Sequence, residues 1–147
     1  MTAEQSQLFV YGTLLSGANH PLGELLRRNA SLIGTGSIAA RLYIIPDPAD
    51  PTNAYPGAIP SGDPADRVHG ELYAITGDST RLLQTLDEFE HCAPGRPEPY
   101  EFLRRTVLVD TANGMAIAAM TYLYTWDVSR ARHVPDGQYA EDGSQVR

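Results

Sequence analysis

The chain has 147 residues, 42% of them hydrophobic and 20% charged, which indicates one globular domain with a sizeable core. A net charge of −7 disfavours nucleic acid and anionic membrane surfaces as partners. The single cysteine, Cys92, excludes an internal disulfide, and the apolar runs fall far short of the roughly 20 residues that span a bilayer. The N-terminus “MTAEQSQ” is polar and lacks a signal-peptide pattern, so we expect a cytoplasmic protein.

The first two predicted elements are a strand and a helix. The run “QLFVYG” (7–12) is apolar and stops at a glycine, which is typical of a strand that ends in a turn. The stretch “HPLGELLRRNA” (20–30) predicts a helix, with Asn19 as a possible N-cap and Pro21 in the first turn.

The next segments are strand-like sequence at 30–46 and a predicted loop that begins at Asp47. Residues 30–46, “ASLIGTGSIAARLYIIP”, predict one or two strands interrupted by glycines. From Asp47 to Arg67 the sequence is rich in Pro, Asp and Gly and predicts a long loop. Within it, Pro56-Gly57 fits the central positions of a type II turn.

The second half predicts a strand, a helix and a hairpin. “RVHGELYAIT” (67–76) is strand-like, and “DSTRLLQTLDEFE” (78–90) predicts a helix that Asp78 or Ser79 can cap. Two strand-like runs, 102–110 and 115–126, flank Asn113-Gly114 and predict a β-hairpin. Five or six strands with two helices favour a mostly antiparallel, partly closed sheet with helices packed against it. We expect one domain over residues 1–147, with its ordered core at about 7–135.

Three carboxylates crowd the end of the predicted helix, in “LDEFEH” (86–91). On a helical wheel Glu90 lies inside the apolar arc, whereas Glu88 points away from it and Asp87 sits just beyond its edge. Fraying at the helix end, or pairing with Arg104 or Arg105, would explain an inward Glu90 without any function. Alternatively, a carboxylate in a partly apolar cleft has a raised pKa, which suits a general acid/base near neutral pH.

A glycine turn follows the first strand, in “VYGTLLSG” (10–17), where successive backbone N–H groups can bind an anion. Six segments in this order and spacing resemble the γ-glutamylcyclotransferase-like family, over residues 8–126: “FVYGTLLSG”, “RLYII…YPGAIP”, “VHGELYAI”, “LDEFE”, “PYEFLRRTVLV” and “TYLYTW”. The resemblance implies an α+β fold built on a small, mixed, mostly antiparallel β-barrel with packed helices. It places the active site in a cavity beside the “YGTL” turn.

The resemblance also implies a reaction. An amine or amino acid is released from a small γ-glutamyl donor while the glutamyl part cyclises to 5-oxoproline, and the family's catalytic glutamate falls on Glu90. The donor supplies its own nucleophile, so the chemistry requires no metal, nucleotide or other cofactor. In the family the “YGTL” turn lines the pocket, which makes substrate-binding candidates of Tyr11, Gly12, Thr13 and Leu14. The same resemblance adds Tyr100, Tyr122 and Tyr124, although an aromatic strand face is more often core than pocket.

Two readings of function stay open. The first is a cyclotransferase acting on γ-glutamyl compounds. The second is a non-catalytic protein of the same fold that binds a small metabolite or a protein. The sequence also departs from the family where His91 replaces the glycine that often follows the glutamate, and where “APGRPEP” lengthens the next loop. Neither the leaving amine nor the oligomeric state follows from the sequence.

Overall fold

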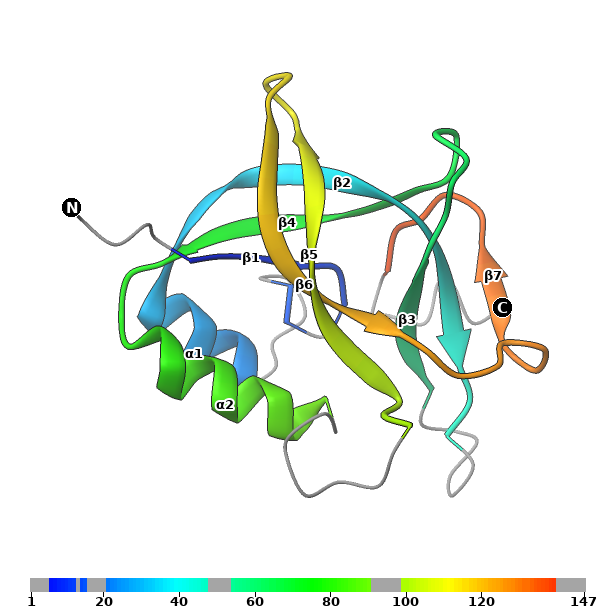
Figure 1. The fold of residues 1–147 in the computed structure, drawn as a ribbon, viewed down its shortest axis with the longest axis horizontal. Coiled ribbons are helices and arrows are strands. Elements are labelled where there is room, and N and C mark those ends of the chain that lie inside the picture. Colours follow the sequence, from blue (N-terminus) through cyan, green and yellow to red (C-terminus); the bar gives the residue numbers. More distant parts are fainter. Residues whose placement is uncertain (1–5, 13, 16–20, 48–53, 91–98, 140–147) are drawn as a thin grey trace.

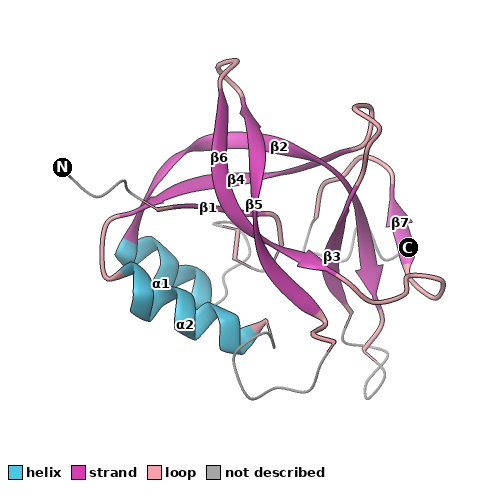
Figure 2. Ribbon diagram, in the orientation of Figure 1, coloured by secondary structure: helices cyan, strands magenta, loops and turns pink. Residues whose placement is uncertain are grey.

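A five-stranded barrel forms the body of the protein (Figures 1 and 2). The computed structural model describes residues 6–12, 14–15, 21–47, 54–90 and 99–139. The barrel strands are β1 (Gln7–Val10), β2 (Ala30–Ile45), β4 (Arg67–Ile75), β5 (Phe102–Thr111) and β6 (Ala116–Tyr124). Their order is β2-β4-β1-β6-β5, and pairing of β2 with β5 closes the ring. Only β1 and β6 pair in parallel. The mixed, mostly antiparallel barrel implied by the family resemblance is therefore confirmed.

The far half of β2 leaves the barrel and forms a second, smaller sheet. It pairs there with β3 (Tyr55–Pro60) on one side and β7 (Arg132–Val134) on the other, both antiparallel. The prediction of one uninterrupted loop from Asp47 to Arg67 was therefore wrong, as was the type II turn at Pro56-Gly57. Because β3 lies at the edge of the sheet, proline and glycine are tolerated within it. Residues 48–53, in the same predicted loop, lie outside the described residues.

Two helices lie side by side against one end of the barrel (Figure 1). They are α1 (Pro21–Asn29) and α2 (Ser79–Phe89). Asp78 is the N-cap of α2, because its Oδ1 accepts a hydrogen bond from the Arg81 N–H at 3.2 Å. The predicted N-cap of α1, Asn19, lies outside the described residues.

Strand β1 is buried on both faces, which explains its continuous apolar sequence. Leu8 and Val10 belong to the core that the barrel shares with the helices, together with Leu26 of α1 and Leu86 of α2. Phe9 belongs to the second core, formed by barrel strands together with β3 and β7 of the smaller sheet. The strand end that leads into the glycine turn is thus fixed from both sides.

The β5–β6 hairpin has the predicted turn at Asn113-Gly114. Gly114 has a φ of +88°, a conformation that glycine adopts without strain. The strands pair from Asp110 with Ala116 to Phe102 with Tyr124, so the aromatic end of β6 lies beside the start of β5. Within the described residues, no helix has the length and apolarity needed to cross a bilayer.

Candidate active site

The turn after β1 is held in place by Tyr11, the first residue of the “YGTL” motif. Tyr11 is buried, its hydroxyl donates to the Tyr122 carbonyl at 2.6 Å, and it accepts from the Ala58 N–H at 3.1 Å. The Leu15 N–H then donates to the Gly12 carbonyl at 2.9 Å and closes the turn. Leu14 is buried in the core shared with the helices. Tyr11 and Leu14 anchor the turn, and Thr13 lies outside the described residues.

Glu90 stands at the end of α2, and its charge acts on Tyr11. Its N–H still donates to the Leu86 carbonyl at 2.9 Å, so the residue is fixed as the helix C-cap. Burial of the carboxyl group, followed by the negative charge of Glu101, raises the pKa of Glu90 to about 8. Burial and the charge of Glu90 in turn raise the pKa of Tyr11 well above its ordinary value. A carboxyl group that gains and loses a proton near neutral pH therefore lies close to Tyr11.

A second carboxylate, Glu101, lies near Glu90. Glu101 is only 8% exposed, and its Oε2 accepts a hydrogen bond from the Tyr55 hydroxyl of β3. Its carbonyl accepts from the Thr125 N–H at 2.9 Å, which ties this residue, just before β5, to the end of β6. Arg104, three residues after Glu101, pairs with Asp87, three residues before Glu90. The start of β5 and the end of α2 therefore lie together, and the charge of Glu101 acts on Glu90.

Asp87, one turn before Glu90, has a structural role, because it links α2 to β5 and β6. Arg104 donates to both of its carboxylate oxygens, at 3.0 and 3.1 Å, and the Tyr122 hydroxyl donates to Oδ1 at 2.6 Å. Arg105 is exposed and donates to the Arg104 carbonyl instead. Arg104 faces α2, where it pairs with Asp87, while Glu88 is exposed as the helical wheel predicted.

A family sequence model described as “Gamma-glutamyl cyclotransferase, AIG2-like” matches residues 8–141. The chain belongs to this γ-glutamyl cyclotransferase family. No curated protein matches it.

Solved structures share the fold of this γ-glutamyl cyclotransferase family member. An AIG2-like protein from Mus musculus is 19% identical with a TM-score of 0.70, and the match covers 98% of this chain and 94% of that one. A protein named gamma-glutamyl cyclotransferase is 22% identical with a TM-score of 0.60, over 83% of this chain and 68% of that one. The protein ytfP from Escherichia coli is 28% identical with a TM-score of 0.57, over 94% and 99%.

The tyrosines proposed to line the pocket of this family member differ in their surroundings. Tyr122 is buried and its hydroxyl is engaged by Asp87. Tyr124 packs edge-on against Phe102 at 5.2 Å, and burial with the charges of Glu101 and Asp127 raises its pKa to about 12. Tyr100 is partly buried, and its carbonyl accepts from the Thr125 hydroxyl. Tyr124 is thus tied electrostatically to Glu101.

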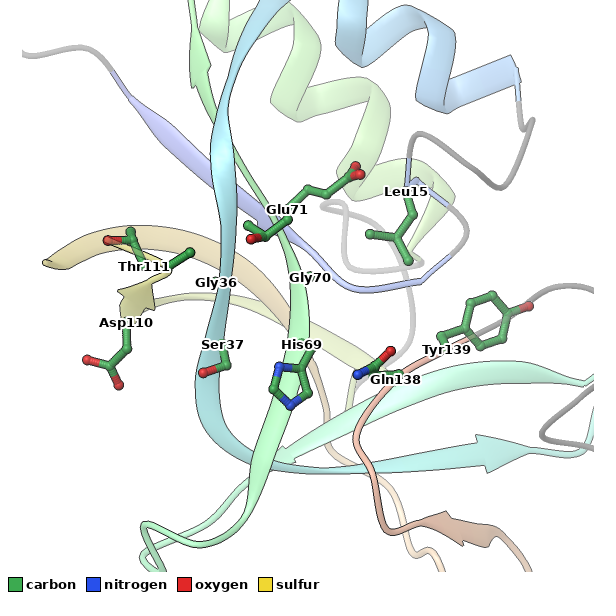
Figure 3. Close-up of a pocket in the computed structure, with 12 residues that line it drawn as sticks. Leu15, Gly36, Ser37, His69, Gly70, Glu71, Asp110, Thr111, Gln138 and Tyr139 are labelled. Atoms are coloured by element: carbon green, nitrogen blue, oxygen red, sulfur yellow. The ribbon is translucent and has the colours of Figure 1, made fainter. Parts of the chain in front are cut away.

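An open groove of about 570 Å³ lies beside Leu15 of the glycine turn and is also lined by residues of β2, β4 and β5 (Figure 3). Leu15, His69, Glu71 and Tyr139 are among the side chains that line it, together with the β2–β5 junction. Neither Glu90 nor Glu101 is among the residues that line this groove. Among the described residues, no group of three or more His, Cys, Asp or Glu side chains could hold a metal ion.

The sequence analysis missed Glu101 and Tyr55. Glu101 precedes a strand and belongs to no periodic pattern, and its partner Tyr55 lies 46 residues earlier in a segment predicted to be a loop. The one local signal is an acid placed between two aromatic residues, in “YEF” (100–102). Such an acid is solvated in most proteins, because charged groups are rarely buried.

Proposed function

We propose that this protein releases 5-oxoproline and a free amine or amino acid from a small γ-glutamyl donor, with Glu90 as the general acid/base. The observation that supports this most strongly is Glu90 itself: it is the C-cap of α2, burial raises its pKa to about 8, and its charge acts on Tyr11. A carboxyl group with this pKa can both accept and return a proton near neutral pH. Membership of the γ-glutamyl cyclotransferase family supports the reaction class.

In the proposed reaction the donor folds so that its α-nitrogen meets its own γ-carbonyl carbon. Ionised Glu90 takes a proton from the α-ammonium, and the amine lone pair forms the new C–N bond. Glu90 then gives its proton to the leaving nitrogen, and the old C–N bond breaks. The α-nitrogen releases its second proton to solvent and remains as the lactam N–H. Holding the donor in this geometry can lower the barrier by several kcal/mol.

The glycine turn is the proposed site for the donor's negative charge. Backbone N–H groups at Gly12, Thr13 and Leu14 would stabilise the donor carboxylate or the oxyanion that develops at the γ-carbon. The support is the fixed conformation of the turn, which the Tyr11 hydroxyl holds through two backbone groups. Donors with backbone N–H groups need no reorganisation when charge develops, and each such group is typically worth about 10²- to 10³-fold in rate.

The test is 5-oxoproline release from a panel of γ-glutamyl amino acids and γ-glutamyl amines. Wild type is compared with Glu90→Gln, and Glu88→Gln serves as the control because that acid is exposed on the same helix. We expect Glu90→Gln to lose at least about 10²-fold in rate and Glu88→Gln to keep its activity. No release by folded wild type would favour the second reading, a binding protein of the same fold.

A further inference from the structure

Glu101 is the acid that the proposed reaction leaves unexplained. Among the described residues, Glu101 and Thr121 are the polar or charged residues that are buried as a whole, whereas Glu90 is partly exposed. Thr121 has a structural role, because its hydroxyl donates to the Phe9 carbonyl at 2.9 Å. Removing a carboxylate from water is costly unless nearby groups compensate. The position of Glu101 next to a second acid increases that cost.

The surroundings of Glu101 bring four segments together. Tyr55 of β3 donates to its carboxylate, and Glu101 acts electrostatically on Tyr124 of β6 and on Glu90 at the end of α2. The rings of Tyr55 and Phe102 are 6.3 Å apart, and those of Phe102 and Tyr124 are 5.2 Å apart. A carboxylate beside an aromatic wall is a favourable site for a small organic cation.

On the basis of the proposed function, we propose that Glu101 and Glu90 form a carboxylate pair that binds the α-ammonium of the donor. Glu101 is the positioning member, whose Oε2 accepts the hydrogen bond from the Tyr55 hydroxyl. Glu90 is the member that exchanges the proton. The site therefore takes compounds with a free α-ammonium group next to the γ-glutamyl amide, and it discriminates against the same compounds without that group.

Burial and the charge of Glu101 keep a proton on Glu90 near neutral pH while the site is empty. An ammonium group placed between the two carboxylates removes their mutual repulsion. Binding then proceeds with loss of the Glu90 proton to solvent, and Glu90 becomes a base once the ammonium is in place. It subsequently accepts one proton from that ammonium, which leaves the neutral amine free to attack.

Several other groups on the adjoining elements can affect the titration of the pair. Three are tyrosines: Tyr11 after β1, Tyr55 in β3 and Tyr124 in β6. The others are the Asp87–Arg104 ion pair between α2 and β5 and two more acids. Asp47 acts on Tyr55, and Asp127 acts on Tyr124. The three tyrosines have raised pKa values and stay neutral at pH 7. Glu101 is the neighbour whose charge raises the pKa of Glu90.

The first test uses the resting protein and needs no turnover. Carbon-detected NMR of the glutamate carboxyl groups follows the titration of wild type, Glu101→Gln and the exposed control Glu88→Gln. We expect one carboxyl group of wild type to titrate near pH 8 and to shift toward its ordinary value in Glu101→Gln only. An unchanged titration in folded Glu101→Gln would overturn the pair.

The second test uses L-glutamine and glutaramate, which differ only in the α-ammonium group. We expect glutamine to lower the apparent pKa of Glu90 and glutaramate to leave it unchanged. Glu101→Gln should weaken glutamine binding about 10- to 100-fold, as expected for loss of a charged partner, and leave glutaramate binding unaffected. Equal weakening of both compounds, or no effect of glutamine on Glu90 in wild type, would overturn the ammonium site.

Tyr55→Phe provides an independent variant, because it leaves both carboxylates in place. Loss of the hydroxyl should weaken glutamine binding in the same direction as Glu101→Gln, without affecting glutaramate. Equal binding of glutamine by Tyr55→Phe and wild type would contradict the role given to Tyr55. The 5-oxoproline assay is separate from these measurements. A protein with a coupled pair that releases no 5-oxoproline would refute the cyclotransferase function while retaining the ammonium site.

Discussion

Gly12 and Pro56 lie in such close contact that no side chain fits between them. A β carbon at Gly12 would stand 2.5 Å from the Pro56 Cγ, well inside van der Waals contact. The two residues belong to “YGTL” and “YPGAI”, motifs more than forty positions apart in the sequence. The edge strand β3 therefore supports the glycine turn directly, and this explains why a glycine occupies position 12.

Gly12→Ala should displace the turn and destabilise the protein. Overpacking of this kind typically costs about 1–3 kcal/mol, and displacement of the turn should also lower kcat/KM. Denaturant unfolding and the 5-oxoproline assay measure the two effects. The control is Gly34→Ala, where an added β carbon meets nothing within 4 Å.

The same contact predicts a rescue. In the double variant Gly12→Ala with Pro56→Ala the clashing Cγ is gone, and the next nearest Pro56 atom, Cβ, lies at an ordinary 3.5 Å. We expect the double variant to be more stable than Gly12→Ala alone. If the stability loss of the double variant equals the sum of the losses of Gly12→Ala and Pro56→Ala, the contact is not the reason for glycine at this position.

Local patterns in the sequence predicted most elements of the fold. Both helices, the barrel strands and the hairpin at Asn113-Gly114 follow from periodicity, caps and turn residues, which act over short distances. Strand β3 was missed because its proline and glycine favour a turn locally, while pairing with β2 determines its conformation. Strand β7 has only three residues, too few for a periodic signal.

The candidate site was predictable only where it depends on one helix. The helical wheel turned Glu90 inward and Glu88 outward, because both positions follow from the geometry of α2. The hydrogen bond from Tyr55 to Glu101 and the ion pair of Asp87 with Arg104 join separate elements. Contacts of this kind depend on how the barrel closes, and no local pattern encodes them.

Asp87→Asn should destabilise the protein without removing the acid/base group. The substitution takes the negative charge from a site where Arg104 and Tyr122 donate three hydrogen bonds. We expect a loss of about 1–3 kcal/mol in the free energy of unfolding, typical of hydrogen bonds to charged groups. Asp110→Asn is the matched control, because the Asp110 side chain is 62% exposed in its ion pair with Arg67 and should cost less than about 1 kcal/mol. Equal losses in the two variants would contradict a structural role for Asp87.

Activity should rise with pH through the pKa of Glu90. The proposed base is the ionised form, and burial with the charge of Glu101 raises this pKa to about 8. We therefore expect kcat/KM to increase up to about tenfold per pH unit below pH 8 and to level off above it. The measurement is the rate of 5-oxoproline release from one donor between pH 6 and 9.5. A profile that is already flat at pH 6 would exclude Glu90 as a base with this pKa.

Glu90 should also make the folded protein less stable as pH rises. Its pKa is about 8 in the folded state against an ordinary 4.5, so between these values the folded protein binds more protons than the unfolded chain. By linkage, the contribution of Glu90 to stability falls across this range, and the loss is complete above about pH 8. Glu90→Gln removes the ionisable group and with it this loss. The free energy of unfolding of the variant should therefore rise relative to that of wild type as pH increases from 5 to 8. At pH 8 this relative gain should be between about 2 and 5 kcal/mol.

Denaturant unfolding of wild type and Glu90→Gln at several pH values measures this difference. Titrating groups that do not interact with Glu90 contribute equally to both proteins, so the difference reports on Glu90 together with its coupling to Glu101. Glu88→Gln removes an exposed carboxylate from the same helix, and its difference from wild type should stay nearly constant with pH. If the curves of wild type and Glu90→Gln run parallel from pH 5 to 8, the carboxyl group of Glu90 is solvated in the folded protein. It would then lack the raised pKa on which the proposed acid/base role depends.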